Sequence, residues 1–355
     1  MPVSSFAIQL RPNDNVAVAA RLLPEGSDIS VNGSTVKILK PVGMGHKVAI
    51  REIPAHAPIF KYGQVIGFAS RNIQAGELVH VHNVRADEFE RDYAFCRECP
   101  PAPAPAEPRF FQGYDRGDGR YGTRNYIAII STVNCSASTS KYIADKIRER
   151  GTLKDFPNVD GIVPIVHKQG CAMQYDGPDH KQLDRTLAGF AKHPNVAAYI
   201  LVGLGCETGQ AMHLIEQQGL VQLHGARKSP TVLSIQECGG IGKTVEAGVR
   251  AIAELLPRVN DIARTRLPAS HIVLGTNCGG SDGNSGVTAN PALGVASDML
   301  VAQGGTSILA ETPEIYGAEH LLTRRAIRRE VGEKLVERIK WWEWYTKVFG
   351  AEINN

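Results

Sequence analysis

The sequence predicts a small all-β domain over residues 1–95, joined by a linker to an α/β domain with a mostly parallel sheet over residues 113–355. Three observations support this prediction: short apolar runs separated by turn residues, a proline- and alanine-rich segment over residues 96–112, and a regular alternation of strands and helices after it. A chain of 355 residues also exceeds one ordinary hydrophobic core, which favours at least two domains.

The first domain is predicted from strand and hairpin patterns. Dipeptides such as Asn32-Gly33 and Tyr62-Gly63 favour tight turns, and no stretch before Asp87 keeps a helical period. Repeated prolines between Cys99 and Pro108 exclude helix and sheet, so the linker is expected to be extended. The predicted strands cover residues 6–10, 16–20, 29–31, 36–39, 48–50, 65–66 and 78–81.

In the larger domain, apolar strands alternate with amphipathic helices, which is typical of a parallel sheet with helices on both faces. Ligands bind such sheets at the carboxyl ends of the strands. The predicted strands cover residues 126–131, 161–166, 198–203, 231–235, 271–275 and 306–310. The predicted helices cover residues 136–150, 178–193, 210–218, 241–256, 291–303 and 318–348.

Charge and hydropathy exclude two classes of partner. The chain has 39 basic and 36 acidic residues and only 6% aromatic residues, so no nucleic-acid-binding surface is expected. No apolar run reaches the roughly 18 residues of a membrane span, and the N-terminus lacks a leader pattern. We therefore expect a cytoplasmic protein without a membrane partner.

Cysteines follow five consecutive predicted strands of the larger domain. The carboxyl ends of parallel strands meet at one edge of a sheet, so these thiols could converge there. Three or four thiolates would suit iron, as one ion or as an iron–sulfur cluster, and zinc is the alternative. Unrelated buried thiols are the other interpretation. The five residues are Cys135, Cys171, Cys206, Cys238 and Cys278.

The segment over residues 277–291 combines glycines, hydroxyls, an Asp and Asn residues directly before a predicted helix. Glycines let backbone N–H groups approach an anion, and a helix N-terminus favours negative charge. This pattern predicts a site for a hydroxylated carboxylate, although an ordinary capped turn would also use some of these residues. Its glycines are Gly279, Gly280, Gly283 and Gly286.

Histidines in the first domain add a second candidate site. His80 and His82 stand two residues apart, and on a strand both would point to one face and could hold one metal ion. His46 and Lys47 follow a glycine turn. Surface histidines without a ligand are the alternative interpretation. Residues 237–244 imitate a phosphate-binding loop, but Glu237 stands where that motif needs glycine, so a nucleotide-binding module is the weaker alternative.

Taken together, these motifs resemble the altronate and galactarate dehydratase family, sugar-acid dehydratases that open with a SAF (β-clip) domain. The similarity covers the whole chain in the expected order. It rests on residues 14–18, 45–49, 61–67 and 80–83 in the first domain, and on residues 122–125, 203–207, 278–291, 312–314 and 317–319 in the second.

The resemblance implies a hydro-lyase that removes water across C2 and C3 of a sugar acid, giving a 2-keto-3-deoxy sugar acid, with a divalent metal, Fe²⁺ or an iron–sulfur cluster, as cofactor. Under this hypothesis His46 and Lys47 are catalytic. The substrate is bound by Lys61, Arg124, Asn125, Ser281, Asp282 and Asn290. The metal ligands come from His80, His82, Cys135, Cys171, Cys206 and Cys278.

Members of the family continue beyond the point where this sequence stops, so we expect a truncated form. The alternative function is therefore a catalytically incomplete fragment or subunit that binds a sugar acid or a partner chain. A homo-oligomer or a complementing C-terminal chain is expected as protein partner, and a small sugar acid as substrate.

Overall fold

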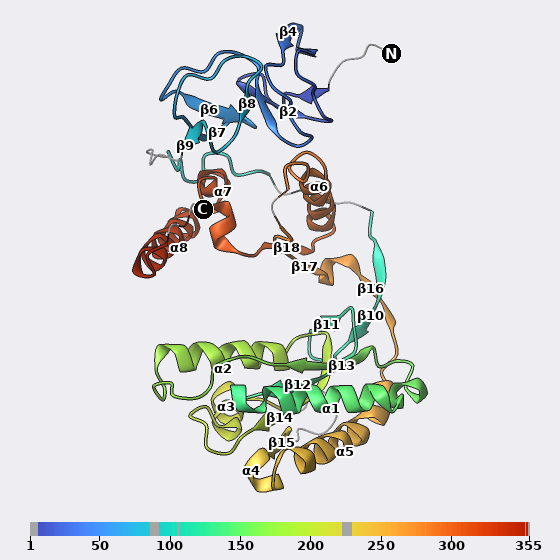
Figure 1. The fold of residues 1–355 in the computed structure, drawn as a ribbon. Coiled ribbons are helices and arrows are strands. Elements are labelled where there is room, and N and C mark those ends of the chain that lie inside the picture. The colour runs from blue at the N-terminus through green and yellow to red at the C-terminus, as the bar shows by residue number, and fades with distance from the viewer. Residues whose placement is uncertain are drawn as a thin grey trace. The chain divides into compact units, whose positions relative to one another are not determined.

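The computed structural model describes residues 6–85, 92–101, 103–104, 107–221, 229–280, 282–351 and 353. The chain forms two compact units. Unit 1 combines Met1–Ala106 with Val273–Asn355, and unit 2 is Glu107–Ile272. This division differs from the predicted one, because residues 273–355 pack with the N-terminal strands (Figure 1).

The first part of unit 1 consists of short antiparallel strands. One sheet has the order β1-β2-β5-β8, another has the order β6-β7-β9, and β3 pairs with β4. The strands are β1 (Ala7–Ile8), β2 (Val16–Ala19), β3 (Asp28–Val31), β4 (Ser34–Lys37), β5 (Lys47–Ala49), β6 (Pro58–Lys61), β7 (Gln64–Ala69), β8 (Leu78–Val79) and β9 (Val84–Arg85). The prediction of an all-β N-terminal region is therefore confirmed.

Two small apolar cores hold these strands together. One contains Ala17 and Ala19, and the other contains Ile59 and Ile73. The β3–β4 hairpin turns at Asn32 and Gly33, whose φ angles are 47° and 85°. Positive φ at both central residues is the geometry that Asn-Gly favours in two-residue hairpins. The turn chemistry of the sequence thus fixes the register of the strands.

The second part of unit 1 is a parallel pair of strands with three helices. It comprises β17 (Val273–Thr276), α6 (Ala289–Ala302), β18 (Thr306–Leu309), α7 (Glu319–Thr323) and α8 (Arg329–Val348). The prediction that these strands continue one large parallel sheet is not realised, because β17 and β18 pair only with each other in the described part of the chain. The predicted helix over residues 318–348 is two helices.

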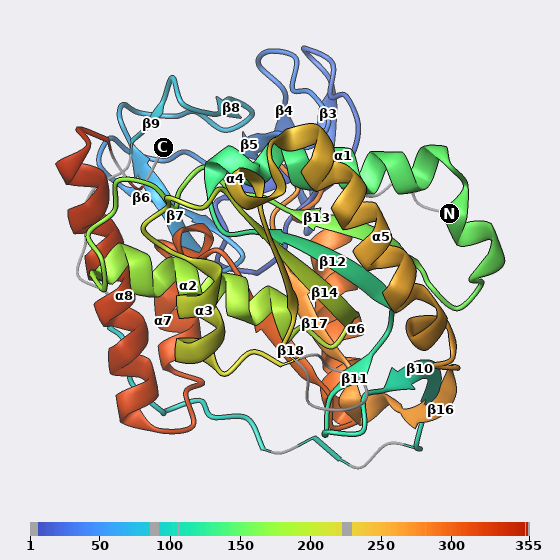
Figure 2. The ribbon, with the colours of Figure 1, turned by 90° about the horizontal axis from the view of Figure 1, so that it is seen from below.

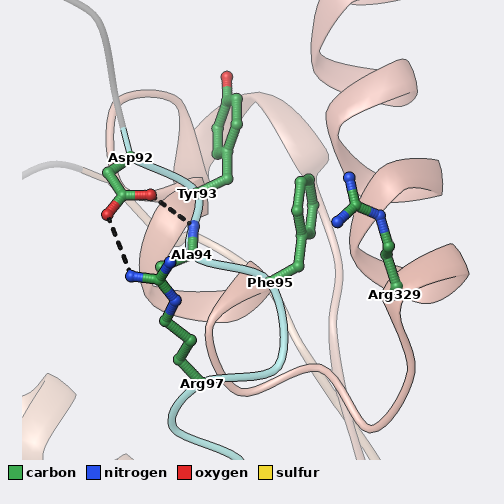
Figure 3. A pocket seen from close by; sticks show the side chains of 6 residues that line it. All are labelled: Asp92, Tyr93, Ala94, Phe95, Arg97 and Arg329. Atoms are coloured by element: carbon green, nitrogen blue, oxygen red, sulfur yellow. Dashed lines mark hydrogen bonds and ion pairs between the residues drawn. The ribbon is translucent and has the colours of Figure 1, made fainter.

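The start of the predicted linker is docked on α7 and α8. The Cys96 N–H donates to the Thr323 carbonyl at 3.1 Å. The Phe95 ring packs closely on Gly332, because a Cβ added to this glycine would lie only 2.6 Å from the Phe95 Cδ1 atom. Figure 3 shows the shallow pocket beside this contact, where Arg329 faces Phe95 and Arg97 pairs with Asp92 at 3.9 Å. Hydrogen bonds and a glycine contact therefore order the start of this segment, ahead of its prolines.

Unit 2 is built on a parallel sheet with the strand order β13-β12-β14-β15. Helices α1 and α5 pack on one face, and α2 and α3 pack on the other (Figures 1 and 2). The elements are β12 (Tyr126–Ser131), α1 (Ala137–Glu149), β13 (Gly161–Ile165), α2 (Pro178–Ala191), β14 (Val196–Gly203), α3 (Ala211–Gln218), β15 (Thr231–Ser234), α4 (Ile235–Cys238) and α5 (Ile241–Asn260). The prediction of strands alternating with helices is confirmed here.

A small antiparallel sheet in unit 2 was not predicted. It has the order β11-β10-β16, with β10 (Phe110–Asp115), β11 (Tyr121–Gly122) and β16 (Thr265–Pro268). Strand β10 begins inside the predicted linker, because pairing with β16 supplies the hydrogen bonds that local sequence did not reveal. No helix in the described part of the chain is long and apolar enough to cross a membrane.

We predict that Gly283→Ala destabilises unit 1 by about 1–3 kcal/mol, because the new Cβ would lie 2.5 Å from the Gly45 carbonyl oxygen. All three tryptophans lie in α8, so urea unfolding followed by tryptophan fluorescence reports on unit 1. Gly279→Ala is the matched control, since a Cβ there meets nothing within 4 Å. Equal unfolding midpoints for the two variants would contradict the prediction.

Candidate active site

The candidate site forms where the Gly45 turn meets the glycine-rich loop of unit 1. Gly45 is buried and has a φ of +81°, a conformation that favours glycine. A Cβ on Gly45 would lie 3.0 Å from the Gly283 carbonyl carbon and 3.1 Å from the Asn284 nitrogen. Backbone therefore touches backbone, and the contact brings His46 and Lys47 beside this loop.

The end of the β6–β7 hairpin contacts the same loop. The Tyr62 hydroxyl donates to the Gly286 carbonyl. A Cβ on Gly286 would lie 3.9 Å from the Lys61 Nζ atom, so the absence of a side chain leaves room for this amine. The Asp14 carboxylate accepts the N–H groups of Tyr62 at 3.1 Å and Gly63 at 2.6 Å, which holds the hairpin end in place.

The register of two strands places His46 and His80 opposite each other, next to Lys47. Strands β5 and β8 are antiparallel, with Lys47 opposite Val79, so His46 and His80 face each other one position further along. Their ring centroids are 5.4 Å apart. His46 is exposed and Lys47 is half-buried, which leaves the imidazole accessible to a ligand.

Burial and mutual repulsion weaken proton binding by these groups. Burial lowers the pKa of Lys47. Burial, and then the charge of Lys47, lower the pKa of Lys61, while Asp14 acts in the opposite direction. Burial, followed by the charges of His46, Lys47 and His82, lowers the pKa of His80. A bound anion would relieve this repulsion, so the site favours a carboxylate.

His80 and His82 do not lie on a strand, so the prediction that alternation places them on one face is wrong. They belong to a turn between β8 and β9 that the buried Asn83 holds. The Asn83 side chain accepts the His80 N–H at 2.9 Å and donates to the Leu78 carbonyl at 2.9 Å. Because this side chain bonds to the backbone of two residues that precede it, it folds the segment back instead of extending it.

The glycine-rich loop presents exposed polar side chains to solvent. The Asp282 carboxylate accepts the Asn284 N–H at 3.0 Å, which shapes the turn, and its residue remains exposed. Asn290 is exposed on the first turn of α6. Both could bind hydroxyls of a ligand. Ser281, predicted to do the same, lies outside the described residues.

The two predicted substrate ligands of unit 2 are placed differently. Asn125 is fully buried, its two side-chain N–H groups donate to the Asn158 and Val259 carbonyls, and its oxygen accepts from Arg116, so burial keeps a substrate away from it. Arg124 is exposed and lies 3.5 Å from Asp160. Both precede β12 and therefore lie at its amino end, opposite the edge where parallel sheets bind ligands. Asn125 is thus a structural residue.

The cysteines follow their strands as predicted. Cys135, Cys171 and Cys206 are exposed beyond the carboxyl ends of β12, β13 and β14, and Cys278 is exposed after β17 in unit 1. Within each unit taken by itself, no described trio of ligand atoms within 4.8 Å of one another includes a cysteine, His80 or His82. The predicted metal set draws on residues of both units and stays a prediction.

The sequence indicates Tyr62 as a turn residue and as part of the family motif over residues 61–67, but Tyr62 was not predicted as a site residue. Its φ of 59° is rare for a residue with a side chain, and such strain often marks functional positions. Burial, and then Asp14, raise the pKa of Tyr62, so its hydroxyl keeps its proton and can donate to Gly286. The Tyr-Gly pair and the motif over residues 61–67 were the signals in the sequence.

We predict that Lys47→Met raises the free energy of unfolding at pH 7 by about 1 kcal/mol, because a charged amine no longer has to be buried. With a lowered folded-state pKa, the wild-type protein gains stability as pH rises from that pKa towards the unfolded value of 10.5. The advantage of the variant should therefore shrink over this range. Urea unfolding followed by tryptophan fluorescence measures the difference in free energy of unfolding between the variant and the wild type. The exposed Lys37→Met is the control. A difference that does not depend on pH would contradict the explanation.

Three family models match the chain in order. The altronate/galactarate dehydratase SAF domain matches residues 5–87, the second domain of D-galactarate dehydratase/altronate hydrolase matches residues 113–260, and the C-terminal domain of D-galactarate/altronate dehydratase matches residues 269–355. Together they cover the β domain, the sheet of unit 2 and the segment that carries the glycine-rich loop.

Curated relatives agree with these matches. The chain is 34% identical to altronate dehydratase of Bacillus subtilis over 340 residues and 35% identical to altronate dehydratase of Escherichia coli over 342 residues, which is 95% of this chain in each case. It is 36% identical to galactarate dehydratase (L-threo-forming) of Escherichia coli over 355 residues, or 96% of this chain. The matched part is 66% of the length of each relative. The chain therefore belongs to the altronate/galactarate dehydratase family.

Proposed function

We propose that this protein is a hydro-lyase that removes water from a sugar acid of the altronate or galactarate type and gives a 2-keto-3-deoxy sugar acid. The observation that carries the proposal is the group of basic side chains, His46, Lys47 and Lys61, against the exposed glycine-rich loop of unit 1. Membership of the family supports the same reaction class.

The substrate carboxylate would bind to Lys61. This amine is half-buried, is repelled by Lys47, and stands beside a glycine that leaves its approach open. A carboxylate there replaces the repulsion between two amines by attraction, and charge-assisted hydrogen bonds are the stronger kind. The exposed Asp282 and Asn290 would bind the hydroxyl groups that distinguish a sugar acid from a simple carboxylate.

Proton transfer would fall to His46 and Lys47. The hydrogen on C2 is weakly acidic, so its removal needs a base within hydrogen-bond reach and positive charge near the carboxylate as the ene-diolate forms. Lys47 has a lowered pKa, which gives it a larger neutral fraction able to accept a proton. The accessible imidazole of His46 would then protonate the departing C3 hydroxyl.

The relatives suggest a divalent metal, and Fe²⁺ or an iron–sulfur cluster is the proposed form. Within unit 1, His80 and His82 belong to no described trio of ligand atoms within 4.8 Å of one another, so these two residues alone would not complete a metal site. The proton transfers above are therefore assigned to side chains of this chain.

The direct test is to incubate the purified full chain with altronate and with galactarate and to follow the 2-keto-3-deoxy product by NMR. The assay is run anaerobically, with and without added Fe²⁺. Product formation from either sugar acid supports the proposal. Binding of a sugar acid without turnover would support the alternative of a catalytically incomplete binding chain, and absence of both would refute the proposed function.

A separate prediction concerns Lys61. Lys61→Met is expected to weaken sugar-acid binding by about 10- to 100-fold, because a hydrogen bond to a charged group is lost. Isothermal titration calorimetry with altronate or galactarate measures the change. Exposed Lys37 on β4, changed to Met, is the matched control and should bind as the wild type does. If Lys61→Met binds equally tightly, the carboxylate is held elsewhere.

A further inference from the structure

A buried carboxylate in unit 1 holds the hairpin that carries Lys61, and the proposed reaction gives this carboxylate no part. Asp14 lies two residues before β2 and is 0% exposed. Its carboxylate accepts three backbone N–H groups, from Arg11 at 2.9 Å, Tyr62 at 3.1 Å and Gly63 at 2.6 Å. Burial of a charged group is costly unless hydrogen bonds compensate it, and here amides of the backbone do so.

Two of these amides belong to the turn at the end of the β6–β7 hairpin. Lys61 pairs with Gln64 across the hairpin, and Tyr62 and Gly63 between them have φ angles of 59° and 72°. Glycine adopts positive φ freely, whereas a tyrosine does so only at an energetic cost. Because both N–H groups donate to one carboxylate, Asp14 stabilises the turn in this unfavourable conformation.

The same turn presents two side chains to the glycine-rich loop. The Tyr62 hydroxyl donates to the Gly286 carbonyl, and the Lys61 Nζ atom lies 4.8 Å from the centroid of the Tyr62 ring. A Cβ on Gly286 would lie 2.6 Å from the Tyr62 hydroxyl oxygen, so the turn sits directly against this glycine. The conformation of one turn therefore sets the place of both the amine and the hydroxyl.

Asp14 also acts on Lys61 through its charge. Burial, and then the charge of Lys47 on β5, lower the pKa of Lys61, whereas the charge of Asp14 raises it. Lys61 must carry its proton to attract a carboxylate, because the neutral amine has no charge to offer. The carboxylate that fixes the turn thus also favours the charged form of the amine that the turn presents.

The neighbouring Asn15 holds the same hairpin by neutral hydrogen bonds. It is 6% exposed, and its side chain donates to the Pro58 carbonyl at 2.9 Å and accepts the Phe60 N–H at 2.7 Å. Both partners lie on β6 before Lys61, and neither belongs to the turn. Asn15 therefore shows how the strand is held by hydrogen bonds alone, and it provides a reference for the role of the charge at Asp14.

We propose that Asp14 is a positioning residue of the sugar-acid site, which fixes the turn at Tyr62 and places negative charge behind the amine of Lys61. The proposal rests on the proposed function, because the carboxylate that Lys61 binds is that of the sugar acid. Asp14 is buried and does not touch the substrate, so its effect passes through the turn. All residues involved belong to unit 1.

The effect of charge is tested by NMR of lysine side chains in the full chain, with the ¹³Cε and ¹⁵Nζ shifts followed as pH rises. Lys61→Met identifies the signal of Lys61. In Asp14→Asn, Lys61 is expected to lose its proton at a lower pH than in the wild type, because a neighbouring negative charge is removed. Asn15→Ala is the matched control and should leave this titration unchanged. Titration of Lys61 in Asp14→Asn at the wild-type pH or above it overturns the proposal.

The effect on the ligand is measured by isothermal titration calorimetry with altronate and galactarate. Asp14→Asn is expected to weaken binding by about 10-fold at pH 7, because the amine that binds the carboxylate is displaced. The loss should grow as pH rises, since Lys61 is deprotonated earlier in the variant. Asn15→Ala should bind as the wild type does. Equal weakening by both variants would mean that Asp14 serves the fold alone, which overturns the proposal.

Asp14→Glu provides the second variant should Asp14→Asn fail to fold, which urea unfolding followed by tryptophan fluorescence reveals. The longer side chain keeps the negative charge but displaces the acceptor oxygens, so Lys61 should titrate close to the wild type while sugar-acid binding weakens. Binding by Asp14→Glu as tight as that of the wild type overturns the proposal. If the wild type binds neither sugar acid, the proposed function fails, and the titration of Lys61 in the variants still decides the role of Asp14.

Discussion

The close contact between Gly45 and Gly283 is the constraint on which the proposed site depends. Two backbones can approach this closely only where neither residue carries a side chain. The contact joins segments separated by more than 200 positions in the sequence, and it places the basic residues of the β domain against the glycine-rich loop.

The basic residues at this contact destabilise the folded state. Lys47 and Lys61 are partly buried and repel each other. Stability alone would favour apolar or uncharged side chains at these positions. Functional sites commonly retain such unfavourable charges because the ligand supplies the compensating one. This is the physical reason to locate substrate binding here and not at the shallow pocket beside Phe95.

Much of the fold was predictable because local patterns decide it. The strand over residues 126–131 and the helices of unit 2 follow apolar periodicity, and the Asn32-Gly33 turn follows backbone preference. Strand β10 was not predictable, because its partner β16 lies about 150 positions away. The site shows the same limit. His46 and Lys61 were found by motif, whereas Asn125 has the right chemistry but is buried, with both side-chain N–H groups bonded to backbone carbonyls.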